Sequence, residues 1–244
     1  MTTHLRRVAA AALCAGAALA LTACSSSAGS PATAGAPVGA GSSTSSAPDP
    51  TAGLPTGTKL AAYLLPGKAV PSLKADNQAG VNSGDAYLEP STKAVAKAEA
   101  CQLLGGTGWM TASGIGPASS AGNDFMNSYG VEYYQQLDVF EGARATQDFA
   151  ALKKVLTECK AYPASSNGSK YTMHVKLKTL TGLGDEAVEA VMTSPDLQGG
   201  ETLVAIREGR LVVTTSYNDQ SGTGAKAVTL ARELLKKVPA SAAS

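Results

Sequence analysis

The sequence predicts an α+β fold in which an antiparallel sheet of about five strands packs against two or three helices, with one disulfide. Apolar residues that alternate with polar ones indicate strands, and apolar residues spaced three and four apart indicate helices. The elements follow the order helix, strand, helix, four strands, helix. That order has a tight hairpin and no regular βαβ repeat, which favours antiparallel pairing.

A short helical turn and then three helices are expected along the chain, each with an apolar face and each closed by Gly or Pro at its C-terminal end. Ser91 is placed to cap the second of them, on which Val95, Ala98 and Cys101 share one face. The segments are 59–65, 92–104, 143–161 and 225–238.

Five strands are expected from alternation and β-forming composition. In the second strand, Tyr171 and Met173 point one way, whereas His174 and Lys176 point the other way, toward solvent. A turn at Glu208-Gly209 joins the last two strands into a hairpin. The strands are 131–140, 171–180, 186–193, 203–207 and 211–217.

The N-terminus has the pattern of a secretion signal over residues 1–23. Arg6 and Arg7 precede an apolar run over 8–21 that is short for a membrane span. The run ends in Leu-Thr-Ala-Cys at 21–24, which resembles the bacterial lipobox. That resemblance implies cleavage before Cys24, with diacylglycerol on its thiol and an acyl chain such as palmitate on its new amine. The alternative is an ordinary secreted protein with a chance cysteine there.

Residues 24–57 are expected to be a lipidated cysteine followed by a disordered tether. Thirty of the 33 residues from 25 to 57 are Ser, Ala, Gly, Pro or Thr, which bury too little apolar surface to fold. One globular domain follows over 58–240, with a disordered tail at 241–244. The protein is thus expected on the extracytoplasmic face of the cell membrane, held there by its lipid anchor.

Two cysteines remain after processing, because Cys14 leaves with the signal and Cys24 carries lipid. Cys101 and Cys159 lie in an oxidising compartment, so we expect a disulfide between them. Two buried free thiols are the alternative. A metal site is disfavoured, because two cysteines and one histidine do not complete a tetrahedral set.

The charge balance argues against nucleic acid as a partner. Of 20 Lys and Arg and 19 Asp and Glu, only Arg6, Arg7 and Asp49 lie outside the domain, which leaves 18 of each sign. Phosphate binding and polybasic membrane patches both need a surplus of Lys and Arg.

Catalytic chemistry is not apparent, so we expect no enzyme, no cofactor and no metal. His174 is the only histidine of the mature chain and lies on a solvent face. The acids Asp185, Glu186 and Glu189 favour solvated loop charge, with a cryptic hydrolase as the alternative. The Gly-rich stretch 105–122 lacks the Gly-Lys-Ser/Thr ending of a phosphate loop.

Four large side chains are candidate contacts for a ligand or a partner. Trp109 and Met110 lie in the Gly-rich stretch, which suggests a mobile loop. The alternative is that Trp109 packs into the core. Tyr134 and Phe140 face away from Tyr133 on their strand, so they line a groove if helices cover only one face of the sheet.

Three segments of the domain resemble the extracellular sensor-like domains of actinobacterial PknH-type serine/threonine kinases, and lipoproteins that share them. They are 60–65, 139–145 with the run to Cys159, and 211–214 before an Ala-rich helix. The resemblance implies an α/β sandwich-like domain with a groove and a ligand-sensing role. The family usually has two disulfides, whereas this chain can form one.

The expected function is therefore non-enzymatic binding or sensing by a cell-surface lipoprotein. Its ligand is unknown and is a small molecule, a lipid or an envelope protein. The alternative is a structural or assembly lipoprotein that acts through protein contacts in the envelope.

Overall fold

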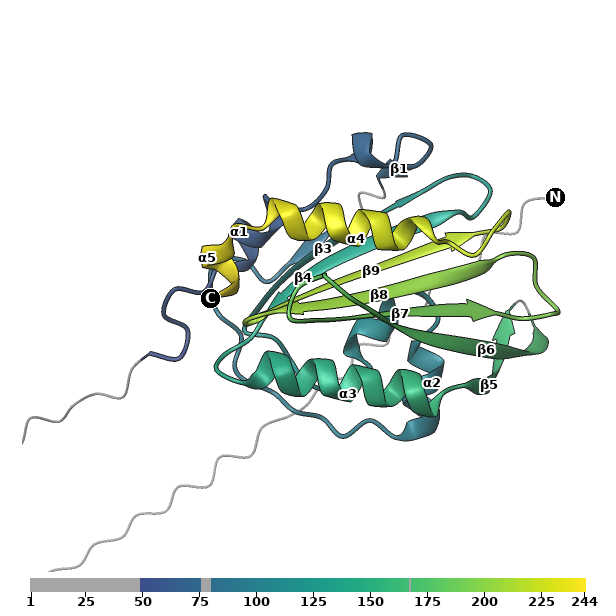
Figure 1. Cartoon of the computed structure of the whole chain (residues 1–244), viewed down its shortest axis with the longest axis horizontal. Helices are drawn as coiled ribbons and strands as arrows, with labels where there is room; N and C mark the ends of the chain where they lie inside the picture. The colour runs from purple at the N-terminus through teal and green to yellow at the C-terminus, as the bar shows by residue number, and fades with distance from the viewer. Residues whose placement is uncertain (1–48, 76–79, 167) are drawn as a thin grey trace, which may run out of the picture. The chain divides into compact units, whose positions relative to one another are not determined.

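The computed structural model of the protein describes residues 49–75, 80–166 and 168–244 (Figure 1). Its centre is a nine-stranded sheet in which every pair of neighbouring strands is antiparallel. The strand order is β1-β3-β4-β9-β8-β7-β6-β5, and β2 also pairs with β3. The strands are β1 Lys74–Ala75, β2 Val81–Asn82, β3 Ser119–Met126, β4 Glu132–Val139, β5 Ala161–Ser166, β6 Ser169–Leu180, β7 Glu186–Thr193, β8 Gly200–Glu208 and β9 Leu211–Asp219.

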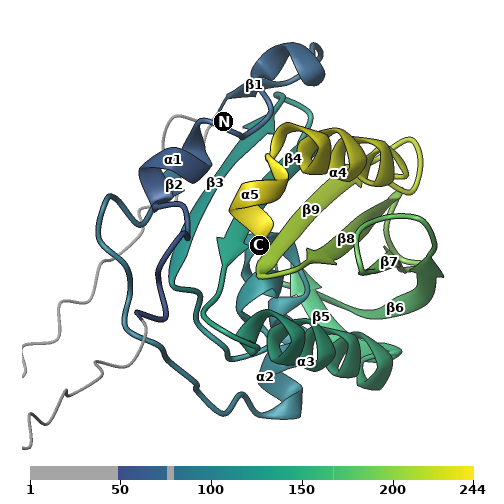
Figure 2. The ribbon, with the colours of Figure 1, turned by 60° about the vertical axis from the view of Figure 1, so that its left-hand side comes forward.

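Helices cover both faces of this sheet, so the expected α+β class is confirmed. Figures 1 and 2 show α4 and α3 on opposite sides of it. We call the side of α1, α4 and α5 the first face, and the side of α2, η2 and α3 the second face. The helices are α1 Gly57–Ala61, η1 Gly67–Ala69, α2 Lys97–Leu103, η2 Gly106–Thr111, α3 Arg144–Glu158, α4 Lys226–Lys237 and α5 Ala240–Ala243.

The core on the first face lies between α4 and the central strands. Ala227 and Leu234 of α4 pack with Tyr133, Val213 and other buried residues of β4 and β9. Thr215 of β9 donates a hydrogen bond to the backbone oxygen of Ala227 at 3.2 Å, which fixes the start of the helix on the strand. Successive residues of a strand point to opposite faces, so the intervening residues of β9 face the other core.

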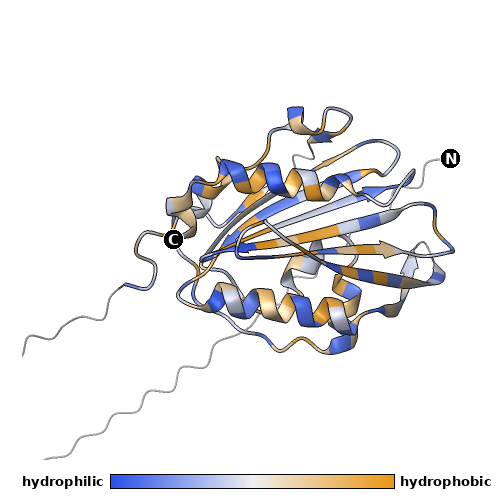
Figure 3. Ribbon diagram, in the orientation of Figure 1, coloured by the Kyte–Doolittle hydropathy of each residue, from blue (hydrophilic) through white to orange (hydrophobic). Residues whose placement is uncertain are grey.

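The core on the second face lies under α3. Phe149, Leu152 and Leu156 of α3 pack with Ala190 of β7 and Leu203 of β8. With both faces covered, the central strands are buried along nearly their whole length. Figure 3 shows this as a nearly continuous apolar stretch in β8.

The sheet is larger than the expected five strands, because four strands have weak sequence signals. β1 and β2 are only two residues long, and β3 lies in the Gly-rich stretch that we expected to be a mobile loop. Gly122 of β3 is required there, because a Cβ would lie 2.6 Å from the hydroxyl oxygen of Tyr134. β5 contains Pro163, which is tolerated because β5 is an edge strand.

The first long helix is shorter than expected. It begins at Lys97, its N-cap is Ala96 without a side-chain cap, and Thr92 instead forms an isolated bridge with Ile115. The prediction that Ser91 caps this helix is therefore wrong.

The domain also extends beyond the expected limits at both ends. Leu54 is only 4% exposed and belongs to the core on the first face, so the folded part begins before residue 58. Residues 240–243 form α5 rather than a disordered tail, because Ala242 and Ala243 are buried and Ala243 accepts a 2.7 Å hydrogen bond from the Arg210 backbone. The signal, Cys24 and most of the tether lie outside the described residues. Within those residues, no helix is both long and apolar enough to cross a bilayer.

The expected disulfide is present and joins α2 to the residue that follows α3. Cys101 and Cys159 have Cα atoms 5.4 Å apart and are separated by 58 positions in sequence. We expect Cys101→Ala/Cys159→Ala to lower the free energy of unfolding by about 4 kcal/mol, because the unfolded chain gains freedom. Urea unfolding measures this, and reduced wild type is the control. An unchanged urea midpoint in both samples would contradict the prediction.

Candidate functional site

A cleft of about 750 Å³ lies on the second face. Its walls come from β5, β6, the loop 194–199 and the residues just before and at the start of η2. A volume of this size fits a small-molecule ligand. We call it the cleft.

Glu201, the second residue of β8, is an acid that lines the cleft and is bonded to the backbone. Its carboxylate accepts a hydrogen bond from the backbone N–H of Gly106, a residue with φ of +73° at the start of η2. Burial raises the pKa of Glu201 to about 8, and the nearby charge of Glu132 acts in the same direction. Near neutral pH this carboxyl is therefore mostly protonated and able to donate a hydrogen bond.

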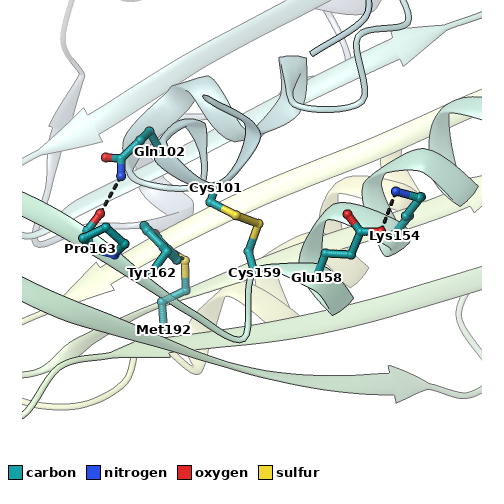
Figure 4. The surroundings of a disulfide bond; sticks show 8 residues. All are labelled: Cys101, Gln102, Lys154, Glu158, Cys159, Tyr162, Pro163 and Met192. Atoms are coloured by element: carbon teal, nitrogen blue, oxygen red, sulfur yellow. Dashed lines mark hydrogen bonds and ion pairs between the residues drawn. A yellow bond between two sulfur atoms is a disulfide. The ribbon is translucent and has the colours of Figure 1, made fainter. Parts of the chain in front are cut away.

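The other walls of the cleft are aromatic, thioether and amide groups. Tyr162 donates a hydrogen bond to the Met192 sulfur at 3.8 Å, and Gln102 donates to the backbone oxygen of Pro163, beside the disulfide (Figure 4). The described residues that line the cleft include the acids Asp196 and Glu201 and no Lys, Arg or His. The cleft therefore suits an uncharged polar molecule or an organic cation, and disfavours an anion.

A second, smaller pocket of about 370 Å³ lies at the C-terminal end of β4. We call it the small pocket. Its walls are mostly apolar and include Met110, Ile115 and Phe140, whereas its polar floor is Gln136 and Asp138. Tyr134 donates a 2.8 Å hydrogen bond to Gln136, whose amide nitrogen lies 2.8 Å from both carboxylate oxygens of Asp138.

Two buried acids lie near each other beside the small pocket. Burial raises the pKa of Asp138 to about 8 despite the Gln136 hydrogen bond, and Asp148 on α3 raises it further. Burial also raises the pKa of Asp148 to about 7, although Ser113 donates a 2.5 Å hydrogen bond to it. At neutral pH Asp138 is therefore a neutral acid whose hydroxyl is a donor at the pocket floor.

The structure separates the four candidate contact residues. Trp109 is fully buried in the core of the second face, because residues 106–111 form a helix on the sheet and not a mobile loop. Met110 and Phe140 both line the small pocket, and Tyr134 reaches its floor through Gln136. Helices cover both faces, so the condition for an open groove beside Tyr134 and Phe140 is not met. Ligand contact by Met110 and Phe140 stays a prediction.

The acidic residues singled out in the sequence are held in ion pairs. Arg207 bonds Asp185 at 2.7 Å and Glu186 at 3.4 Å, Lys153 bonds Glu186 at 3.2 Å, and Lys178 lies 3.7 Å from Glu189. Among the described residues, no cluster of three or more His, Cys, Asp or Glu could hold a metal ion.

The sequence does not single out Glu201, Gln136 or Asp148 as site residues. Gln136 and Asp138 occupy alternate positions of β4 with Tyr134 and Phe140, and polar residues at such positions are typical of a solvated side of a strand. Two aromatic residues on the same side were the signal that this face is also buried.

Comparison with known proteins finds the same fold in a solved structure. No family model and no curated protein matches the chain. Among solved structures it is similar to the extracellular domain of PknH from Mycobacterium tuberculosis, with a TM-score of 0.55 and 15% sequence identity. The match covers 75% of this chain and 96% of that one. This likeness shows that the two domains share a fold.

The raised pKa values of Asp138 and Asp148 predict that the free energy of unfolding falls as pH rises. The folded protein keeps a proton on Asp138 up to about pH 8, whereas the unfolded chain releases it near the ordinary value of 3.8. The unfolded state therefore binds fewer protons between these values, and the free energy of unfolding decreases across this window. Asn mimics the neutral acid, so Asp138→Asn should raise the melting temperature at pH 9 by about 5 °C.

The measurement is a melting curve at each pH from about 5 to about 9. Asp138→Asn/Asp148→Asn should flatten the profile further, whereas Asp85→Asn, which removes an exposed carboxylate, should leave its slope unchanged. A slope in Asp138→Asn equal to that of the wild type would contradict the assignment.

Proposed function

We propose that this protein is a lipid-anchored, extracytoplasmic binding domain that senses a small uncharged or cationic molecule in the cleft. The observation that carries the proposal is the cleft itself, which is of ligand size and has acidic, aromatic and amide walls. Its lining includes Glu201, held by the Gly106 backbone, together with hydroxyl and amide groups, and a few fixed polar groups give a binding pocket its specificity.

Two further observations support this role. The fold is similar to that of a kinase extracellular domain, which favours placement outside the cytoplasm. The Cys101–Cys159 disulfide suits an oxidising compartment. The proposed lipid on Cys24 then keeps the domain at the membrane, at the end of the tether.

Non-enzymatic action is part of the proposal. The acids Asp185 and Glu186 share Arg207 and Lys153, so their charge is already balanced by neighbouring side chains. Asp138 and Glu201 lie in separate pockets, in which each serves as a polar group for recognition.

Three probes of one shape test the charge preference of the cleft: tyramine, 4-ethylphenol and 4-hydroxyphenylacetate. We expect the cation and the neutral phenol to raise the melting temperature, and the anion to leave it unchanged. Tyramine should bind more tightly at pH 8.5 than at pH 6.5, because Glu201 ionises across its pKa of about 8.

Glu201→Gln keeps a group that accepts from Gly106 but removes the charge, so it should weaken tyramine binding about tenfold at pH 8.5. Asp138→Asn in the small pocket is the matched control and should leave it unchanged. If none of the three probes shifts the melting temperature, ligand binding in the cleft is contradicted.

The anchor is tested by Cys24→Ser. Without the thiol no diacylglycerol is attached, so the protein should leave the membrane fraction or keep its signal. Cys14→Ser changes a cysteine of the proposed signal and should leave the fractionation as in the wild type. The measurement is immunoblotting of membrane and released fractions with mass determination. An anchored and cleaved Cys24→Ser protein would refute the anchor.

A further inference from the structure

β6 carries two different surfaces on alternate residues. Tyr171 and Met173 line the cleft on the second face. Lys170, Lys176 and Lys178 alternate with them, and all three are exposed. The strand therefore presents aromatic and thioether groups on one side and ammonium groups on the other.

Sheet register places the lysines of β6 on the face that carries α4. Lys178 pairs with Glu189, Glu189 with Val204, and Val204 with Thr215. Thr215 donates its hydroxyl hydrogen bond to α4, so this row of residues points to the first face. Helix α4 packs on β8 and β9, and the exposed side chains of β6 show that its first-face side remains open to solvent.

The surface formed in this way, which we call the basic face, is rich in cations. Helix α4, which packs on β8 and β9 on the same face of the sheet, adds further exposed basic side chains. The acids on the same side are Glu189, whose side chain lies mostly beneath Lys178, with Glu208, Asp219 and Glu233 at strand ends and on α4. The residues of the basic face are Lys170, His174, Lys176 and Lys178 of β6 and Lys226, Arg232, Lys236 and Lys237 of α4.

The domain is neutral overall, yet several of its acids lie away from the basic face. Asp196 and Glu201 line the cleft, and Asp138 and Asp148 are buried, all away from the basic face. Net charge therefore gives a poor account of the field at either surface.

We propose that the basic face docks on the anionic lipid headgroups of the membrane to which the chain is anchored. This inference rests on the proposed anchor at Cys24. The several acyl chains proposed on Cys24 hold the chain at the membrane, and a basic patch adds a second contact that brings the domain itself onto the bilayer surface. A chain segment between the proposed anchor and the domain keeps the domain within reach of the bilayer and so raises the effective concentration of the headgroups.

Docking by this face also orients the cleft. Tyr171 and Met173 point to the side of the sheet opposite Lys170 and Lys176, so the cleft does not face the bilayer when the lysines do. The proposed ligand then reaches the cleft from outside the membrane.

The test uses the mature chain, residues 25–244, made without lipid, and sedimentation with vesicles. We expect binding to vesicles with about 30% phosphatidylglycerol in phosphatidylcholine and none to phosphatidylcholine alone. Raising NaCl from about 50 to about 300 mM should weaken binding, because salt screens surface charge. Lys170→Gln/Lys176→Gln/Lys178→Gln should weaken it on the order of a hundredfold.

The matched control is Lys93→Gln/Lys97→Gln/Lys154→Gln, which removes three exposed lysines associated with α2 and α3. It should retain vesicle binding, and both variants should keep the wild-type melting temperature. Equal weakening by the two triple variants, or no binding to anionic vesicles, would overturn the proposal. Binding to soluble poly(glycerol phosphate) without binding to vesicles would overturn it in favour of a wall polymer. If the protein does not bind the vesicles but Cys24→Ser is still released from membranes, the docking is rejected and the proposed anchor is not.

Discussion

The covalent bond between Cys101 and Cys159 is the constraint on which the second face depends. Helices α2 and η2 are seven and six residues long, too short to persist as isolated helices in water. The bond fixes α2 beside the end of α3, and the chain that follows then places Leu104 and Trp109 in the core. The same two helices supply walls to the cleft and to the small pocket. Both hollows therefore rely on one cross-link, whereas the first face is covered by the longer helix α4.

Local sequence pattern was enough to predict the elements with clear periodicity. Helices α3 and α4 and strands β4 and β6–β9 lie where spacing and alternation placed them. The misses have physical causes. β3 is rich in Ser, Ala and Gly because Tyr134 lies across Gly122, and β5 tolerates Pro163 because it has a neighbour on only one side. Neither cause can be seen without knowing which segments pair.

The candidate site was harder to predict, because burial of an acid is decided by distant parts of the chain. Asp138 and Asp185 look alike in sequence, yet α3 and the loop before β3 cover Asp138, whereas Asp185 stays at the surface beside Arg207. Alternation separated Tyr134 from Tyr133 correctly but gave no information on whether the second side met water or helices. Charge counting has the same limit, because it averages over surfaces that the sheet keeps apart.

The number of residues in β6 determines which of its side chains face each of the two surfaces of the sheet. Because side chains alternate, one residue inserted within β6 would turn the lysines toward the cleft and Tyr171 toward the first face. Substitutions at even and odd positions can accumulate independently during evolution, whereas insertions and deletions are tolerated only in the turns at either end of the strand. Among related chains, we therefore expect the two surfaces of β6 to diversify separately on a strand of constant length.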